Sequence, residues 1–410
     1  MLNALWISFF LTAFGAALLQ FFGGDQTIFA VVMKAAFDSA KTAFEVALGL
    51  TGVMCLWLGV MKIGERAGFL AVLGRLLAPL FARLFPDVPR GHPALGSVTM
   101  NMAANILGLD NAATPMGLKA MRELQDLNPD KETASNAQIL FLVLNASSVT
   151  LLPVTIFTYR AQMGALDPTD VFIPILMATY CSTLAGFLFV AVVQRIRLDA
   201  VVLAWLGGVT ALVGGLAYYF ARLPAAQMTM ESSVLSNFLL LALLAVFLVG
   251  AAIKRVNAYE AFIEGAKEGF HTAVTIIPYL VAMLVAIGML RASGALPAFV
   301  AGIRALVQTL GFDTAWVDAL PTMVMKPLSG SGARAMMIET MQGAGADSFA
   351  GRLACIVQGS SETTFYVLAV YFGSVGIKRV RHAVAGGLIA DLAGFIAAVL
   401  AAYLFFGAFI

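Results

Sequence analysis

Long apolar stretches, separated by short polar or charged segments, run through the whole sequence. Several approach the roughly 20 residues that an α-helix needs to cross the hydrocarbon core of a bilayer. Because backbone polar groups in lipid must be satisfied within the protein, the pattern predicts an all-α polytopic membrane protein. The expected membrane spans are residues 4–22, 44–63, 136–158, 171–194, 200–220, 233–252, 272–291, 349–373 and 383–408.

Two further stretches, residues 93–124 and 315–342, are moderately hydrophobic and are interrupted near the middle by polar and turn residues. Each half is too short to cross the bilayer alone. We therefore expect re-entrant helical hairpins that enter and leave the membrane on the same side. Three amphipathic segments, residues 29–44, 69–85 and 259–270, are expected to lie in the membrane interface.

The second half of the sequence repeats the first. The matching segments are 40–41 and 266–267 (both AK), 145–150 and 358–363 (NASSVT and QGSSET), and 184–187 and 392–395 (both LAGF). If each copy crosses the membrane an even number of times, one added span turns the second copy upside down. We predict two inverted repeats, residues 1–197 and 223–410, joined by a linker transmembrane helix within 198–222.

Composition supports a membrane location and restricts the chemistry. Of 410 residues, 60% are hydrophobic and 12% are charged, whereas soluble chains are about a quarter charged. The three cysteines and three histidines lack metal-ligand spacing, and no nucleotide-binding or hydrolase motif occurs. We expect no enzymatic activity, no cofactor and no metal. The partners expected are membrane lipid and a solute, with no nucleic acid.

Basic residues mark the loops expected on the cytoplasmic side. Such residues occur at 195–197, 254–255 and 378–381, whereas the loop 164–170, the counterpart of 378–382, has neither Lys nor Arg. Opposite charge bias in matching loops is what inversion predicts. Counting spans gives a cytoplasmic N-terminus and an exterior C-terminus in a bacterial inner membrane.

The first interrupted hairpin carries polar residues near its break at Gly108 and Pro115. Helix ends at such a break present unpaired N–H and C=O groups that can hold charged parts of a solute. Alternatively, the polar side chains cap these helices or bond them to their neighbours. The candidate solute contacts are Asn101, Asn105, Asp110, Asn111 and Thr114.

Lys326 lies in the second hairpin, within residues 326–332 (KPLSGSG). A lysine in an apolar setting is costly without an anionic partner. We expect Lys326, with Ser329 and Ser331, to clamp an anionic group of the solute. A structural ion pair, or snorkelling of the ammonium to the interface, is the alternative.

Polar breaks also interrupt the spans that follow the two hairpins. Glycine and consecutive Ser or Thr residues permit a helix to unwind and expose carbonyl groups. Alternatively, the hydroxyls bond back to carbonyls four residues earlier. The expected solute contacts in these breaks are Asn145, Ser147 and Ser148 in the first copy and Gln358, Ser360 and Ser361 in the second.

A carboxylate within a membrane span is by default a proton or cation site, or the partner of a buried lysine. Glu362 has no acidic counterpart in the first copy, where Val149 stands. We assign Glu362, Thr363 and Asp391 to coupling with H⁺ or Na⁺, and Lys326–Glu362 is the preferred ion pair.

Several of these motifs resemble known families. Residues 59–66 (GVMKIGER) and 111–120 (NAATPMGLKA) are similar to spore maturation protein A, and 259–269 (YEAFIEGAKEG) and 358–368 (QGSSETTFYVL) to spore maturation protein B. Both halves resemble the nucleoside recognition, or Gate, group, whose relatives include concentrative nucleoside transporters and the membrane part of ferrous-iron transporters. The resemblance implies a natural fusion and a transport-type fold, but it identifies no solute.

Three functions are compatible with the sequence. The leading one is a secondary transporter or permease that alternates access to a midplane site for a small polar or ionic solute, nucleoside-like or anionic. The others are translocation of a lipid-linked head group, and a non-transporting membrane scaffold in envelope or spore maturation. Glycine pairs at 207–208, 214–215 and 386–387 permit close helix contacts, so we expect a homodimer.

Overall fold

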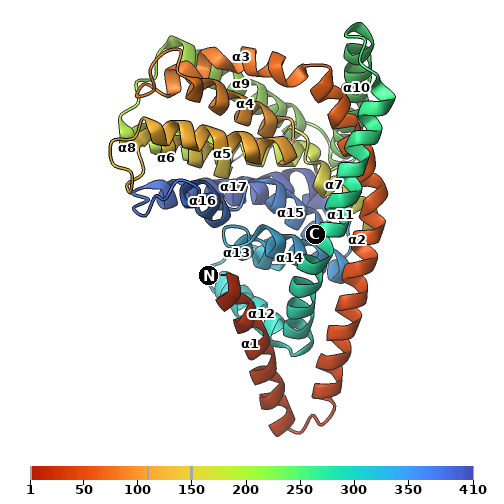
Figure 1. Ribbon diagram of the computed structural model, residues 1–410. Helices are drawn as coiled ribbons and strands as arrows, with labels where there is room; N and C mark the ends of the chain where they lie inside the picture. The colour runs from red at the N-terminus through yellow and green to blue at the C-terminus, as the bar shows by residue number, and fades with distance from the viewer. Residues whose placement is uncertain (1, 109, 148–150, 410) are drawn as a thin grey trace.

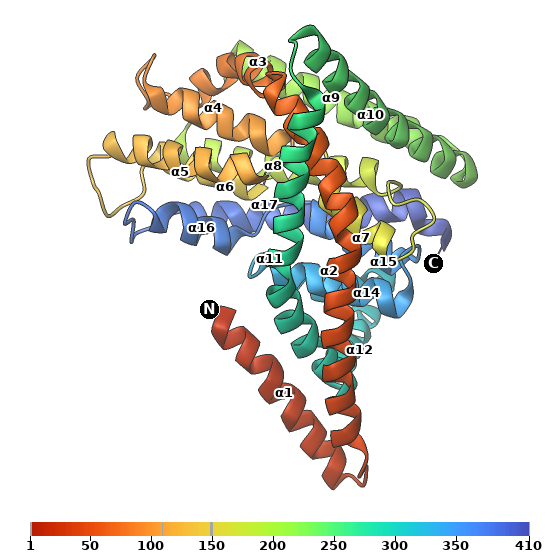
Figure 2. The same ribbon diagram turned by 45° about the vertical axis from the view of Figure 1, so that its right-hand side comes forward.

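The computed structural model describes residues 2–108, 110–147 and 151–409, which form helices and connecting loops (Figures 1 and 2). The first half contains α1 (Leu2–Phe22), α2 (Ile28–Arg66), α3 (Phe69–Leu84), α4 (Pro93–Ile106), α5 (Asp110–Asp126), α6 (Asn136–Ser147), α7 (Val154–Gln162) and α8 (Phe172–Gln194). After α9 (Ala200–Ala221), the second half contains α10 (Ala225–Ile253), α11 (Ala258–Ala292), α12 (Ala295–Thr309), the 3₁₀ turn η1 (Ala315–Ala319), α13 (Leu320–Met325), α14 (Gly330–Ala344), α15 (Phe349–Gly359), α16 (Thr364–Gly373), α17 (Ala383–Phe406) and the 3₁₀ turn η2 (Gly407–Phe409).

Among the described residues, eight helical segments are long and apolar enough to cross a membrane. They confirm the polytopic all-helical class. The expected span 136–158 is not among them: it is divided between α6 and α7, and residues 148–150 between these helices lie outside the described residues. The eight segments are residues 3–22, 28–66, 172–194, 200–221, 230–253, 258–292, 349–373 and 383–406.

Two of the three amphipathic segments are not separate helices, so that expectation is wrong for them. Residues 29–44 continue into the following span as α2, and residues 259–270 continue likewise as α11. Both junctions lack proline, and their alanine-rich sequence favours an unbroken helix. Only the segment 69–85 forms a helix of its own, α3.

The long helices α2 and α11 pack against each other in opposite directions (Figure 2). Glycines permit this approach: a Cβ at Gly265 would collide with the carbonyl oxygen of Leu58, and one at Gly288 with Ser39. Lys62 reinforces the contact through ion pairs with Glu264 and Glu268 at 3.5 and 3.4 Å. The two equivalent helices of the sequence repeat are therefore antiparallel neighbours.

The helices α8 and α17, which contain the repeated LAGF segments, also pack against each other and run antiparallel. A Cβ on Gly186 would lie 3.0 Å from Ala390, and one on Gly394 would lie 3.1 Å from Ser182. At the far end Gln194 contacts the His382 ring at 3.1 Å. The helix α9, which the sequence predicts to be a linker, packs against α3 and α8.

The close glycine contact between α2 and α11 predicts a sharp difference between two substitutions. Gly265→Ala should destabilise the protein by about 1–3 kcal/mol, because the methyl group meets backbone that cannot yield. Gly302→Ala is the matched control, since no atom lies within 4 Å of its added Cβ, and it should be neutral or stabilising. Thermal unfolding in one detergent checks both; equal effects would contradict this packing.

Candidate functional site

The four interruptions that the sequence predicts come together through their backbones. Residues 107–109 separate α4 from α5, and residues 326–329 separate α13 from α14. The other two breaks follow α6 and α15, and the freed backbone groups bond across from one break to another. These bonds run from Leu151 N to Ile106 O (2.9 Å), from Glu362 N to Ala146 O (2.7 Å) and from Phe365 N to Pro327 O (3.0 Å).

A polar cavity of about 90 Å³ lies at this junction. Lys326, only 3% exposed, lines it and donates from Nζ to the carbonyl oxygen of Gln358 at 2.8 Å. Both sequence copies contribute to its wall. The lining residues are Gly108, Leu152, Pro153, Val154, Thr155, Ile156 and Tyr159 from the first copy and Lys326, Arg334, Met337, Gln358, Gly359, Ser361 and Glu362 from the second.

Two buried polar groups in the cavity wall are not saturated with hydrogen bonds in the described structure. Gln358 Oε1, on a side chain that is 9% exposed, has no hydrogen-bond partner, and the Tyr159 hydroxyl, 1% exposed, interacts only with Arg334. Arg334 lies over the Tyr159 ring, 5.7 Å from its centroid. Because an unsatisfied buried polar group is costly, these groups are available to a polar ligand.

On the first-copy side of the junction, amide side chains form a network with a tyrosine from the second copy. Asn105 Nδ2 donates to Asn145 Oδ1 at 2.8 Å, and the Tyr371 hydroxyl donates to the same oxygen at 3.2 Å. Asn101 donates to the carbonyl of Ala113 in α5 at 2.7 Å. These amides therefore bond helices together.

On the second-copy side, Asp391 is buried and accepts hydrogen bonds from two hydroxyls. Ser361 Oγ and Thr364 Oγ1 each donate to it at 2.7 Å. These two hydroxyls come from the break after α15 and from the start of α16, so they tie that break to α17. The direct Lys326–Glu362 pair stays a prediction.

The remaining candidate residues have varied positions. Ser329 caps α14 by accepting from the Gly332 amide at 3.1 Å and contacts Ser331 at 3.2 Å. Ser147 and Ser360 bond back to carbonyls three residues earlier, at 3.3 and 2.8 Å. Thr363 is buried with no partner for its hydroxyl among the described residues, whereas Thr114 is exposed. Ser148 and the side chains of Asp110 and Asn111 lie outside the described residues.

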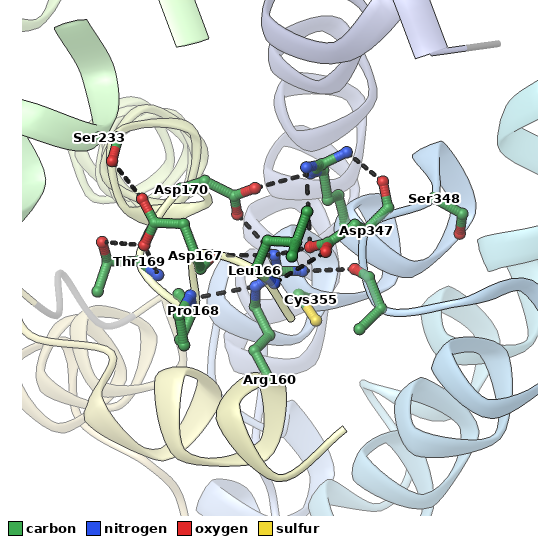
Figure 3. Close-up of polar contacts among 12 residues, drawn as sticks. Arg160, Leu166, Asp167, Pro168, Thr169, Asp170, Ser233, Asp347, Ser348 and Cys355 are labelled. Carbon is green, nitrogen blue, oxygen red and sulfur yellow. Dashed lines mark hydrogen bonds and ion pairs between the residues drawn. The ribbon is translucent and has the colours of Figure 1, made fainter. Parts of the chain in front are cut away.

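A buried ion cluster joins the two copies at another place, and sequence reasoning missed it (Figure 3). Arg160 is fully buried in α7 and pairs with Asp170 at 2.8 Å and with Asp347 at 3.0 Å. Arg352 from α15 donates to the second oxygen of Asp170 at 2.8 Å. Arg160 also donates to the carbonyl of Ala346 at 2.7 Å.

Asp167 extends the cluster to α10, where Ser233 donates to it (Figure 3). Burial alone would raise the pKa of Asp167. The hydrogen bonds from Ser233 and Thr169 outweigh that effect and hold the pKa below its usual value. Asp167 therefore remains ionised at neutral pH. In the sequence, the buried ion cluster is indicated by charged residues at the ends of otherwise apolar helices.

The eight apolar helical segments, one of them interrupted between α15 and α16, define a polytopic helical membrane protein. The nucleoside recognition (Gate) family model matches residues 47–163 and 273–378, slightly more than half of the sequence. The chain belongs to this family.

Two relatives each align with about half of the chain. Spore maturation protein A of Bacillus subtilis (strain 168) is 39% identical over 188 residues, which cover 46% of this chain and 93% of the relative. Spore maturation protein B of the same organism is 43% identical over 175 residues, 42% of this chain and 97% of the relative. These matches confirm the expected resemblance to a fusion of the two. No solved structure matches the chain.

The buried ion cluster predicts a large cost for removing its central carboxylate. Asp170→Asn leaves two buried guanidiniums short of a counter-charge, and breaking such a pair costs about 3–5 kcal/mol. Asp130→Asn is the control, because its ion pair with Arg379 is solvent-exposed and worth less than about 1 kcal/mol. Unfolding in detergent measures both variants. A cost for Asp170→Asn no larger than for Asp130→Asn would show that the cluster is not structural.

Proposed function

We propose that the chain is a secondary transporter of the bacterial inner membrane, with alternating access to the cavity at the four breaks. The observation that carries the proposal is that unwound backbone from both sequence copies converges on one polar cavity. Interrupted helices that meet at a polar site are the arrangement by which inverted-repeat transporters bind solutes and ions.

In this proposal, residues 1–197 and 223–410 are inverted repeats joined by a linker helix within 198–222. The antiparallel α2–α11 and α8–α17 pairs support the inversion. The α4–α5 pair is a re-entrant hairpin, and the elements from η1 to α14 form its counterpart. The basic loops then place the N-terminus in the cytoplasm and the C-terminus outside.

Reciprocal loop contacts give the inversion further support. The loop before α6 bonds to the loop before α17, where the Ala134 amide donates to the Arg379 carbonyl at 2.9 Å. The loop before α15 contacts the loop before α8, where the Leu166 amide donates to the side-chain oxygen Oδ2 of Asp347 at 2.9 Å. Exchanging the two copies therefore exchanges these two pairs of loops, although the individual hydrogen bonds differ.

These two loop contacts also serve as gates of unequal strength. The first is held by exposed ion pairs, Lys378–Glu132 at 2.7 Å and Arg379–Asp130 at 3.2 Å. The second contains the buried cluster centred on Arg160. Exposed ion pairs add little stability, whereas breaking a buried pair is costly. Opening on the Lys378 side therefore requires less free energy.

The cavity fits a small solute with an anionic or strongly hydrogen-bonding group. Lys326 and Arg334 supply positive charge, and the Tyr159 hydroxyl and Gln358 amide supply hydrogen bonds. Glu362 and Asp391 carry the coupling H⁺ or Na⁺. Transport by these groups requires no cofactor, metal or covalent catalysis.

Translocation of a lipid-linked head group is the second candidate, favoured by one observation. An apolar groove of about 230 Å³ lies between α3, α4, α8 and α9, and Asn105 of the amide network lines it. An acyl chain in this groove would bring its head group toward the helix breaks. The two candidate functions share one fold and differ in the molecule carried, which is a small solute in the first and a lipid-linked head group in the second.

Solute flux in proteoliposomes tests the transport proposal. The purified protein should accelerate uptake of at least one member of a panel of nucleosides and small carboxylate or phosphate anions. Lys326→Gln should reduce that uptake about tenfold or more, because it removes a charge-assisted contact in the cavity. Lys119→Gln, on an exposed lysine of α5, should leave it unchanged.

Two results would redirect this account. Flux that persists unchanged when Lys326→Gln, Gln358→Leu and Glu362→Gln are combined would place the pathway elsewhere. Accelerated movement of a fluorescent lipid between leaflets, without solute flux, would favour the head-group candidate. Each variant is first checked for an unchanged elution volume and unfolding temperature.

A further inference from the structure

A basic pocket at one end of α8 is unrelated to the polar cavity. It has a volume of about 300 Å³. Arg83, Arg195 and Arg197 line it, together with Gln194 and Asp87. Arg83 forms an ion pair with Asp199 at 2.7 Å. Neither Arg195 nor Arg197 has an ion-pair partner among the described residues. Three guanidiniums face two carboxylates, so the pocket is net positive.

The apolar groove adjoins this pocket, and Leu84 lines both. The groove is walled by α3, α4, α8 and α9 and includes Phe187, Trp205 and Leu206. Its lining is almost wholly aliphatic or aromatic. The two spaces together therefore offer a cationic mouth that leads into an apolar channel.

Position relative to the bilayer follows from connectivity. The residues 195–199 join α8 to α9, and both helices are candidate membrane spans. A short loop between two consecutive spans must lie at a membrane surface. The pocket containing Arg195 and Arg197 therefore lies at head-group level, and the groove between α8 and α9 lies at acyl-chain level.

The local backbone places an arginine at the helix end. Arg195 ends α8 in the left-handed conformation, with φ of 54°, where glycine is the usual residue. A glycine there would relieve the backbone but would supply no guanidinium. One guanidinium group can donate two parallel hydrogen bonds to two oxygens of a phosphate, a geometry that the lysine ammonium does not provide.

We propose that this pocket and groove bind an anionic phospholipid, with its phosphate on Arg195 and Arg197 and one acyl chain in the groove. Basic pockets between membrane helices on the cytoplasmic side bind anionic lipid head groups in this way. The basic pocket is separate from the proposed solute cavity, so the proposal does not rest on solute transport, although the groove is the one that a lipid-linked cargo would use.

The fluorescence of Trp205 provides the test. The protein is reconstituted in phosphatidylcholine vesicles that contain increasing fractions of a lipid brominated on its acyl chains. This lipid is either phosphatidylglycerol or phosphatidylcholine. The signal of Trp205 is the difference between the native protein and Trp205→Phe. Brominated phosphatidylglycerol should quench this signal at a several-fold lower mole fraction than brominated phosphatidylcholine. Equal quenching by the two lipids would overturn the proposal.

Variants that remove positive charge test whether the preference for phosphatidylglycerol depends on Arg195 and Arg197. Replacing both Arg195 and Arg197 by Gln should abolish the several-fold preference, because each arginine near an anionic lipid is worth up to about fivefold in binding. Quenching by brominated phosphatidylcholine should persist, which shows that the groove is intact. Replacing Lys254 and Arg255 by Gln removes the same charge from another basic loop and should leave the preference unchanged. Equal losses in both double variants would mean a general surface potential.

Inorganic phosphate separates a lipid site from a free-anion site. Millimolar phosphate in the vesicle buffer should not alter the lipid preference, because phosphate lacks the acyl chain that the groove binds. Loss of the preference on adding phosphate would assign the arginines to a soluble anion and overturn the lipid assignment.

Discussion

The backbone groups freed at helix breaks must find partners inside the protein, and this constraint determines the arrangement of the centre. Each break alone would leave polar N–H and C=O groups without partners in an apolar setting. Here the breaks satisfy one another: the end of α4 accepts from Leu151, Ala146 accepts from Glu362, and Pro327 accepts from Phe365. The Lys326 ammonium caps another exposed carbonyl, that of Gln358. A polar cavity of about 90 Å³ lies at this junction.

Antiparallel packing between equivalent helices brings the breaks to one place. Glycines on α11 and on α8 and α17 allow backbones to approach closely where a larger residue would separate them. The reciprocal loop contacts outside the centre differ in chemistry, with exposed pairs at Lys378 and buried pairs at Arg160. In the proposed transporter these contacts would be one weak and one strong closure, an asymmetry that suits alternating access.

Local pattern was sufficient to predict most elements from the sequence, but not their partners. The apolar runs predicted most span positions, and the polar insertions predicted helix breaks near Gly108 and in 326–332. The break expected at Pro115 is wrong, because α5 continues through that proline, and the re-entrant hairpins stay a prediction. The sequence did not predict that α2 is continuous, because the charged residues in its first half are typical of a helix that lies in the membrane interface. Arg160 and Asp170 pair with each other across a short loop. Their other partners, Asp347 and Arg352, lie 187 and 182 residues away in the sequence, and no local pattern records such a pairing. Lys326 was found because a lysine among apolar residues is anomalous wherever it folds.

Opposite orientation of the two halves is the central claim, and thiol accessibility measures it most directly. Single cysteines are introduced at Lys131, in the loop before α6, and at Leu166, which is 94% exposed in the loop before α8, after Cys55, Cys181 and Cys355 are replaced by alanine. Two further single-cysteine variants are then made in the equivalent loops of the second half, at Gly345 and Gly376. A membrane-impermeant reagent applied to intact cells should label positions 166 and 345 and should reach 131 and 376 only after permeabilisation. Labelling of 131 and 345 from the same side would show that the two halves point the same way, and the inverted-repeat account would be wrong.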